Sequence, residues 1–184
     1  MSLVTNNSLI SVLTRSNSFT VDECEQIIEL GIHMRKLSGI ARGQYANIRD
    51  SKVCFISPGH ETNWIFAKLQ ALVMSANQQY RFHVSGFHEP LQFAEYESGG
   101  HYGWHLDVGS DITSRRKISA SVQLSDGSAY EGGDVEFVNI DIPEDARSMG
   151  SITLFPSYLA HRVTPVTKGM RRSLVAWVHG NPFT

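Results

Sequence analysis

Residues 96–107 read YESGGHYGWHLD and carry the strongest structural signal in the chain. The two glycines at 99–100 interrupt an aromatic and apolar run that resumes beyond them, which predicts a strand, a tight turn and a second strand. Alternate residues of a strand point to the same face, so His105 and Asp107 are expected to face one common point. An imidazole and a carboxylate held in this way are candidate metal ligands.

The His-x-Asp pair carries little weight alone, because eight histidines and 18 acidic residues among 184 produce about 0.8 such pairs by chance. A strand histidine beside an aspartate that opens a turn is the ordinary alternative. A third residue favours the metal site: a predicted buried strand at 151–155 is stopped by Pro156, and His161 follows it. Two histidines and one carboxylate form the facial triad that binds Fe(II) and leaves the other coordination positions open.

The last predicted strand runs from Arg171 to Trp177, after a turn at 168–169. Alternation sorts its side chains into two faces, with Arg171, Ser173, Val175 and Trp177 on one and Leu174, Ala176 and Val178 on the other. A guanidinium that enters the interior beside a hydroxyl suits a dicarboxylate ligand, because a buried charge needs a partner. A surface arginine at the start of a strand is the alternative.

Together these segments resemble the prolyl 4-hydroxylase-like branch of the 2-oxoglutarate/Fe(II)-dependent dioxygenases, and in particular bacterial hydroxylases of the PKHD type. The resemblance covers about residues 80–180. It rests on residues 96–107, on YEGGD at 130–134, on LFP at 154–156 and on HRVTPVTKGMR at 161–171. It implies an α+β fold, in which N-terminal helices pack against a double-stranded β-helix (jelly-roll) core.

The resemblance also implies the cofactors and their ligands. His105, Asp107 and His161 would bind Fe(II), Arg171 would bind the C5 carboxylate of 2-oxoglutarate, and ascorbate would act as the reductant. Many prolyl hydroxylases have a lysine where this chain has Arg171, so the arginine follows the PKHD-like variant. The implied reaction hydroxylates an unactivated C–H bond and releases succinate and CO2. A prolyl residue of a peptide or protein is the first candidate for the substrate.

Three further residues are expected at the cosubstrate pocket. Tyr96 matches a tyrosine that lines the pocket of the resembled enzymes, Ser173 shares the face of Arg171, and Gln123 stands where some relatives have another tyrosine. Gln123 belongs to a predicted strand at 117–124 in which polar and apolar residues alternate. Its polar side suits a wet ligand cavity, while the ordinary orientation of such a strand buries the apolar side instead.

Two other classes of protein fit part of this pattern. A cupin-like metal enzyme that does not use 2-oxoglutarate has a jelly roll with similar ligands, but it does not need a dicarboxylate clamp such as Arg171 with Ser173. A non-catalytic sensor of 2-oxoglutarate or metal would keep the pocket. Such a protein arises most simply when an enzyme loses one of its metal ligands, so an incomplete triad would be expected. The complete triad therefore favours the enzyme.

The composition suits a single domain over residues 1–184, with 1–80 as mainly helical support and 81–180 as the catalytic core, since 41% of the residues are apolar. A net charge of −2 without a lysine or arginine run argues against nucleic-acid binding. The chain has no apolar run long enough to cross a membrane. Cys24 and Cys54 lack metal-like spacing, which favours a reducing cytoplasm. A peptide, a protein or a small molecule remains open as the substrate.

Two helices are expected in the N-terminal part. A capping box at Thr20–Glu23 starts the first, which runs to about Leu37, and the second is expected at 62–77. A loop at 40–44 and an extended segment at 47–56 separate them. The remaining strands are expected near residues 81–86, 91–96, 117–124, 134–137 and 151–155.

Other polar residues near the motifs receive ordinary structural interpretations. His83 and His88 are expected in strands or loops, and His101 in the glycine-rich turn, where a contact with substrate is the minority interpretation. His179 is expected beyond the barrel, although it shares the parity of Arg171. The cationic cluster at 115–117 is expected in a solvated loop, with an acidic substrate as the alternative.

Overall fold

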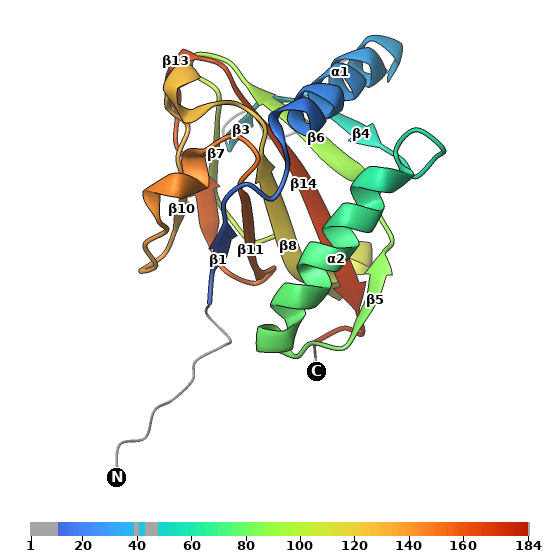
Figure 1. Ribbon diagram of the computed structural model, residues 1–184. Coiled ribbons are helices and arrows are strands. Elements are labelled where there is room, and N and C mark those ends of the chain that lie inside the picture. Colours follow the sequence, from blue (N-terminus) through green and yellow to red (C-terminus); the bar gives the residue numbers. More distant parts are fainter. Residues whose placement is uncertain (1–10, 39–40, 43–47, 184) are drawn as a thin grey trace.

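The computed structural model describes residues 11–38, 41–42 and 48–183. Two β-sheets face each other, and the two long helices, α1 (Val21–Ser38) and α2 (Asn63–Tyr80), pack against the outer face of the larger sheet (Figure 1). The inner faces of the sheets enclose the polar residues that the sequence singled out. The architecture thus separates an apolar layer beneath the helices from a polar interior between the sheets.

The larger sheet has the strand order β1-β11-β8-β14-β6-β4-β2, and β5 pairs with the C-terminal end of β14. Its strands are β1 (Leu13–Arg15), β2 (Ala41–Arg42), β4 (Lys52–Ile56), β5 (Val84–Phe87), β6 (Leu91–Tyr96), β8 (Arg116–Gln123), β11 (Ile152–Pro156) and β14 (Arg171–Gly180). All of these pairings are antiparallel.

The smaller sheet has the order β10-β12-β7-β3, and a separate ribbon joins β9 to β13. Its strands are β3 (Arg49–Asp50), β7 (His101–His105), β10 (Val135–Phe137) and β12 (His161–Val163), and the ribbon is β9 (Tyr130–Gly132) with β13 (Val166–Gly169). Short 3-10 turns lie at Asp111–Arg115, Gly127–Ala129 and Glu144–Arg147.

The predicted capping box forms at the start of α1. The Thr20 hydroxyl accepts a hydrogen bond from the backbone N–H of Glu23 at 3.2 Å, and the Glu23 carboxylate accepts one from the backbone N–H of Thr20 at 2.7 Å. These bonds satisfy two donors that the first turn of a helix leaves without partners. The predicted first helix is confirmed.

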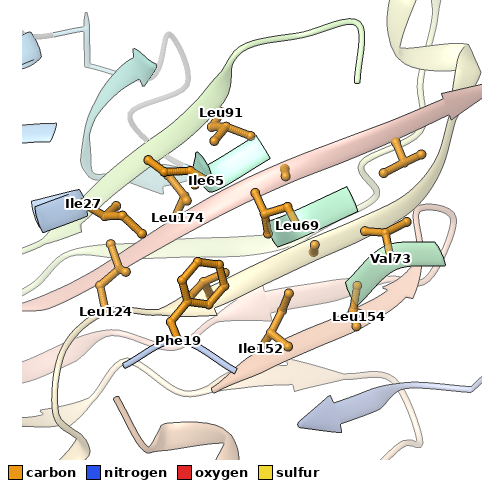
Figure 2. Close-up of a cluster of buried hydrophobic side chains, with 14 of the residues drawn as sticks. Phe19, Ile27, Ile65, Leu69, Val73, Leu91, Leu124, Ile152, Leu154 and Leu174 are labelled. Atoms are coloured by element: carbon orange, nitrogen blue, oxygen red, sulfur yellow. The ribbon is translucent and has the colours of Figure 1, made fainter. Parts of the chain in front are cut away.

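Helix α2 buries one face against the larger sheet. Ile65, Leu69 and Val73 recur at helical spacing, are fully buried, and lie in one cluster with Leu154 and Leu174 of the sheet (Figure 2). Fully burying such a side chain contributes about 1.5–3 kcal/mol relative to leaving it exposed, so this face fixes the helix on the sheet.

The alternation of β8 and β14 is resolved by the packing. The apolar residues of both strands join the core beneath the helices: Ile118, Ala120, Val122, Leu174, Ala176 and Val178. The alternate residues Arg171, Ser173, Val175 and Trp177 line an interior cavity, together with Ser121. The polar side of β8 therefore faces inward, and the predicted parity of β14 is confirmed.

Three boundaries differ from the sequence prediction. Helix α2 continues to Tyr80, and Arg81 caps it in the left-handed conformation at φ 59°, so β5 starts only at Val84. The loop predicted at 40–44 is wrong for residues 41–42, which form β2; residues 40 and 43–44 lie outside the described residues. These elements depend on pairing partners and caps that hydrophobic periodicity does not reveal.

The predicted turn at 168–169 is also wrong, because both residues end β13 and pair with β9. Gly169 adopts φ 76°, and a Cβ there would lie 2.3 Å from the Ala129 carbonyl oxygen. The glycine thus permits a close approach of two backbones rather than a chain reversal. Over the described residues, neither long helix is apolar enough to serve as a membrane span.

Candidate metal centre and adjoining cavity

The three predicted metal ligands converge between the sheets. His105 ends β7, Asp107 follows two residues later, and His161 opens β12 directly opposite His105 in the antiparallel register. The potential ligand atoms of these residues all lie within 4.8 Å of one another. Each Nε2 atom is 3.7 Å from an oxygen of the Asp107 carboxylate. Segments that are more than 50 residues apart in sequence thus form one cluster.

Backbone carbonyls orient both imidazoles. The Nδ1 atom of His105 lies 2.9 Å from the Gly103 carbonyl oxygen, and Nδ1 of His161 lies 2.9 Å from that of Leu159. A carbonyl oxygen only accepts, so each Nδ1 carries a hydrogen, which leaves each Nε2 as the ring nitrogen available to a metal. Burial, with the neighbouring His161, lowers the pKa of His105 to about 4. The neutral imidazole is the form that binds a metal.

Hydroxyl groups orient the carboxylate. The Ser119 hydroxyl donates to Oδ2 of Asp107 at 2.6 Å and lies 2.9 Å from the Ser157 hydroxyl. The backbone N–H of Asp107 donates to the Ser157 carbonyl oxygen at 3.0 Å. Among the described residues, no lysine or arginine side chain forms an ion pair with the Asp107 carboxylate. Two imidazoles held through Nδ1 and one carboxylate that lacks such a partner are a donor set that fits a divalent cation.

Arg171 lies on the inner face of β14 and is only 3% exposed. Its guanidinium contacts the Ser173 hydroxyl at 3.5 Å and lies 5.5 Å from the centre of the Tyr96 ring. No carboxylate of the described residues is within ion-pair distance of it, whereas the next residue, Arg172, pairs with Glu95 at 2.9 Å. A buried guanidinium with only neutral partners suits an anionic ligand.

One cavity of about 290 Å³ connects the metal cluster to Arg171. Its walls also include Tyr96, Ser173, Phe155 and Val163. A second cavity, of about 580 Å³, shares Arg171 with the first. The cluster and the buried cation therefore face the same cavity, as a ligand that bridges them requires.

Gln123 lies away from the metal cluster. It lines the larger cavity, and its Nε2 donates to the Ser125 carbonyl oxygen and to the Tyr130 hydroxyl, both at 2.9 Å. The structure thus brings Tyr96 and Ser173 beside Arg171, and Gln123, the cross-strand partner of Ser173, lines the larger cavity together with Arg171.

A charged network that the sequence did not predict supports the Asp107 segment. The Arg116 guanidinium donates to both carboxylate oxygens of Glu89, at 2.7 and 2.5 Å, and to the Asp107 carbonyl oxygen at 3.1 Å. It also lies 3.7 Å from the centre of the Trp177 ring. The solvated loop predicted for this arginine is therefore wrong. Held by its bidentate pair with Glu89, Arg116 fixes the backbone at Asp107, while Ser119 fixes the carboxylate.

The same network includes His179, which was expected beyond the barrel. The residue lies within β14, is 1% exposed, and its Nε2 atom is 2.7 Å from Oε1 of Glu89. Burial would raise the pKa of Glu89, but the hydrogen bonds and charge of Arg116 outweigh burial and lower it. Strand parity in the sequence already put His179 on the same face as Arg171. No sequence pattern indicated that Glu89 would lie beside it.

The other histidines stay outside the metal cluster. His88 contacts the Ser85 hydroxyl at 3.0 Å, and Nδ1 of His101 contacts the Gly99 carbonyl oxygen at 3.1 Å. Neither histidine lines the two cavities described above. Their local contacts agree with the ordinary structural interpretation.

Comparisons with known proteins agree with this geometry. A family model described as "2OG-Fe(II) oxygenase superfamily" matches residues 91–179, which include the three residues of the metal cluster and also Arg171. A PKHD-type hydroxylase of Crocosphaera subtropica is 37% identical over 122 residues, which are 60% of this chain and 54% of the relative. One from Thermosynechococcus vestitus is 33% identical over 143 residues, or 74% and 63%. The chain thus spans less than two thirds of these relatives.

Solved structures share the fold. A prolyl-4-hydroxylase of Pseudomonas putida aligns with a TM-score of 0.74 at 22% identity, over 97% of each chain. A prolyl hydroxylase of Trichoplax adhaerens, in complex with a peptide of the hypoxia inducible factor oxygen degradation domain, aligns with a TM-score of 0.72 at 18% identity, over 95% of this chain and 87% of the other. The predicted jelly-roll core with packed helices is confirmed.

Proposed function

The chain belongs to the 2-oxoglutarate/Fe(II)-dependent oxygenase superfamily, within its prolyl 4-hydroxylase-like branch, and on that basis we propose that it is a 2-oxoglutarate-dependent hydroxylase. One observation carries the proposal. The cluster of His105, Asp107 and His161 faces the same cavity as Arg171, a buried guanidinium that has no carboxylate partner among the described residues. Such a cavity suits a ligand that carries a carboxylate at each end.

The three clustered residues hold Fe(II) in this proposal. The Nε2 atoms of His105 and His161 and the carboxylate of Asp107 would be its protein ligands, and Ser119 fixes the carboxylate. Iron, with 2-oxoglutarate and O2, supplies the oxidising power for hydroxylation. The protein positions the reactants and excludes water from the cavity.

Arg171 binds the C5 carboxylate of 2-oxoglutarate, assisted by Ser173. The guanidinium offers two parallel N–H donors, and the ring of Tyr96 restricts its position. Gln123 acts less directly, by holding the Tyr130 hydroxyl at the edge of the larger cavity. The Arg171 guanidinium thus supplies the positive charge that neutralises the C5 carboxylate of the bound 2-oxoglutarate.

The reaction adds one oxygen atom of O2 to an unactivated C–H bond of the substrate. The other oxygen atom enters succinate as 2-oxoglutarate loses CO2, so that the atoms balance. A prolyl residue of a peptide or protein is the first candidate substrate, because relatives are named PKHD-type hydroxylase and structural neighbours are titled prolyl hydroxylase. Ascorbate serves as the reductant that keeps iron ferrous.

Succinate release tests this function. With Fe(II), 2-oxoglutarate, ascorbate and a panel of peptides and amino acids, the unmodified protein should form succinate and products heavier by one oxygen atom. His105→Ala and His161→Ala should abolish succinate formation while the circular dichroism spectrum is retained. Turnover that needs metal but no 2-oxoglutarate would indicate a cupin-like enzyme. Binding of metal and 2-oxoglutarate without succinate would indicate a sensor.

A further inference from the structure

A third arginine faces the metal cavity beside Arg116 and Arg171. Arg49 belongs to β3, where it pairs with Tyr102 of β7. Its Nε donates to the Ser51 hydroxyl at 2.7 Å, its Nη1 donates to Oε1 of Gln92 at 3.3 Å, and its guanidinium carbon lies 4.6 Å from the centre of the Tyr102 ring. All of these partners are neutral.

Arg49 also has an unused donor. Its Nη2 atom is buried and has no hydrogen-bond partner among the described residues, and the same is true of Nε1 of Trp177, which lines the same cavity. Buried donors in folded proteins nearly always have a partner, so two unpaired donors at one cavity require an explanation. Both are explained by a ligand that brings acceptor oxygens.

The charges around the cavity point to the nature of that ligand. Arg116 is paired with Glu89. In the proposed function Arg171 takes the C5 carboxylate, and the metal dication balances Asp107 and the C1 carboxylate of 2-oxoglutarate. Arg49 alone remains without a counter-charge. No described carboxylate is within ion-pair distance of it, and the residues outside the described part include no aspartate or glutamate.

The position of Arg49 limits where the anion can be. Tyr102 contacts the Arg49 guanidinium and also stacks on the His105 ring, with the ring centres 3.5 Å apart and the planes at 13°. The cation therefore lies only one aromatic ring away from a proposed metal ligand. An anionic group bound there shares the cavity with the metal cluster.

We propose that Arg49 binds a carboxylate of the primary substrate, with Trp177 as a second donor. This inference rests on the proposed function and narrows its substrate. The substrate carries a carboxylate near the reacting carbon, as in a free amino acid or in the C-terminal residue of a peptide, rather than reacting in the middle of a chain. An unpaired buried cation favours such a ligand because binding supplies the counter-charge that the protein lacks.

Matched acids and amides test the inference through turnover. Free L-amino acids, N-acetyl amino acids and short peptides with free C-termini are each compared with their carboxamides, by oxygen-dependent succinate release above the substrate-free level. We expect the acids to be preferred, and the preferred acid identifies the source of the carboxylate. Arg49→Gln should raise the KM for that acid at least tenfold. Arg49→Lys, which keeps a positive charge, should raise this KM less. Trp177→Phe, which removes the Nε1 donor together with part of the ring system, should have a smaller effect in the same direction.

Two turnover results would overturn the inference. One is equal use of acids and amides by the unmodified protein. The other is an Arg49→Gln variant whose half-saturating 2-oxoglutarate concentration rises as far as that of Arg171→Ala, since Arg49 would then bind the cosubstrate. Arg115→Gln is the matched control, because Arg115 is exposed and does not line the cavity. Its kinetics should equal those of the unmodified protein.

A second measurement does not depend on finding the substrate. Thermal unfolding is followed for protein loaded with Mn(II) and 2-oxoglutarate, in sodium propionate or in sodium chloride with propionamide at the same concentrations. Propionate should raise the melting temperature of the unmodified protein and of Arg115→Gln, but not of Arg49→Gln. Equal shifts in all three would overturn the inference, as would a shift in none.

The unliganded stabilities separate ligand binding from a structural role for Arg49. If the guanidinium only braces Tyr102, Arg49→Gln lowers the melting temperature and propionate has no selective effect. If the guanidinium instead serves to bind an anion, Arg49→Gln leaves the melting temperature of the unliganded protein unchanged or raises it. Should no succinate form with any compound, the proposed function fails, while the propionate measurement still decides the role of Arg49.

Discussion

On its outer face the larger sheet presents Leu174 and its apolar neighbours to the helices, and on its inner face the adjacent residues Arg171 and Ser173 line a polar cavity. The apolar side chains of the outer face, among them Leu154 and Leu174, are fully buried in one cluster with those of the helices (Figure 2). The inner face is almost as buried but contains Arg171, a cation that has no carboxylate partner in the part of the chain that the structure describes. Burial alone therefore does not distinguish a structural face from a binding face. The two faces differ in charge, because only the inner face contains the Arg171 guanidinium without a described counter-charge.

Complete loss of activity is expected for Asp107→Ala, the largest effect on either face. The substitution removes the only carboxylate of the metal cluster, and the Ser119 hydroxyl loses its acceptor. Succinate release should fall to the level of a sample without protein, while denaturant unfolding changes little, because the carboxylate serves binding rather than packing. Near-normal turnover in this variant would remove Asp107 from the metal site.

On the outer face, Leu174→Ala should act on stability instead. Leu174 is fully buried among the residues of α2 and β11, so its truncation leaves a cavity and costs about 2–5 kcal/mol of unfolding free energy. Ser173→Ala is the matched inner-face control and should change stability far less while raising the KM for 2-oxoglutarate. The measurement is urea unfolding of both variants. Equal destabilisation by the two would contradict the separation of the faces.

Adjacent arginines give a sharper comparison within one strand. Arg171→Ala should raise the KM for 2-oxoglutarate by about 10- to 150-fold, since a hydrogen bond to a charged group contributes roughly 1.5–3 kcal/mol. Arg172→Ala should lower stability and leave this KM nearly unchanged, because Arg172 pairs with Glu95 on the other face. Steady-state kinetics in 2-oxoglutarate decide the matter. A neutral Arg171→Ala beside a damaging Arg172→Ala would reverse the assignment.

The smallest effect is expected from the hydroxyl behind the carboxylate. Ser119→Ala leaves Asp107 in place but removes a hydrogen bond of 2.6 Å, so metal affinity should fall about tenfold, the lower end of what such partners contribute. Competitive titration of Mn(II) measures this affinity. Ser128→Ala, at an exposed position, is the control and should bind Mn(II) as the unmodified protein does. Unchanged affinity in Ser119→Ala would mean that the hydroxyl does not orient the ligand.

The sequence predicted the long, regular parts of the molecule well. Strand β6 was expected at 91–96 and is Leu91–Tyr96, and the alternation of β14 placed Arg171 and Ser173 on the cavity side. These elements are recognisable because hydrophobic period and buried face coincide over several residues. The convergence of His105, Asp107 and His161 followed from strand parity in one segment together with a family resemblance in the other.

The residues that escaped prediction depend on irregular geometry. Arg116 has the parity of the apolar face of β8, but the register between β8 and β14 shifts between Val178 and His179, where Arg116 pairs with His179. A regular alternation rule fails across such a shift. Arg49 lies in a two-residue strand, and its contacts with Gln92 and Tyr102 come from other parts of the chain. No local pattern encodes contacts of this kind.

Anaerobic absorption spectroscopy tests most directly whether the cluster and Arg171 form one site for iron and 2-oxoglutarate. Adding Fe(II) and 2-oxoglutarate together should produce a weak visible band that neither gives alone. The band should be absent in Asp107→Ala, and in Arg171→Ala it should appear only at higher 2-oxoglutarate concentrations. A band in the unmodified protein that needs no 2-oxoglutarate, or one that saturates equally in the unmodified protein and Arg171→Ala, would contradict the account.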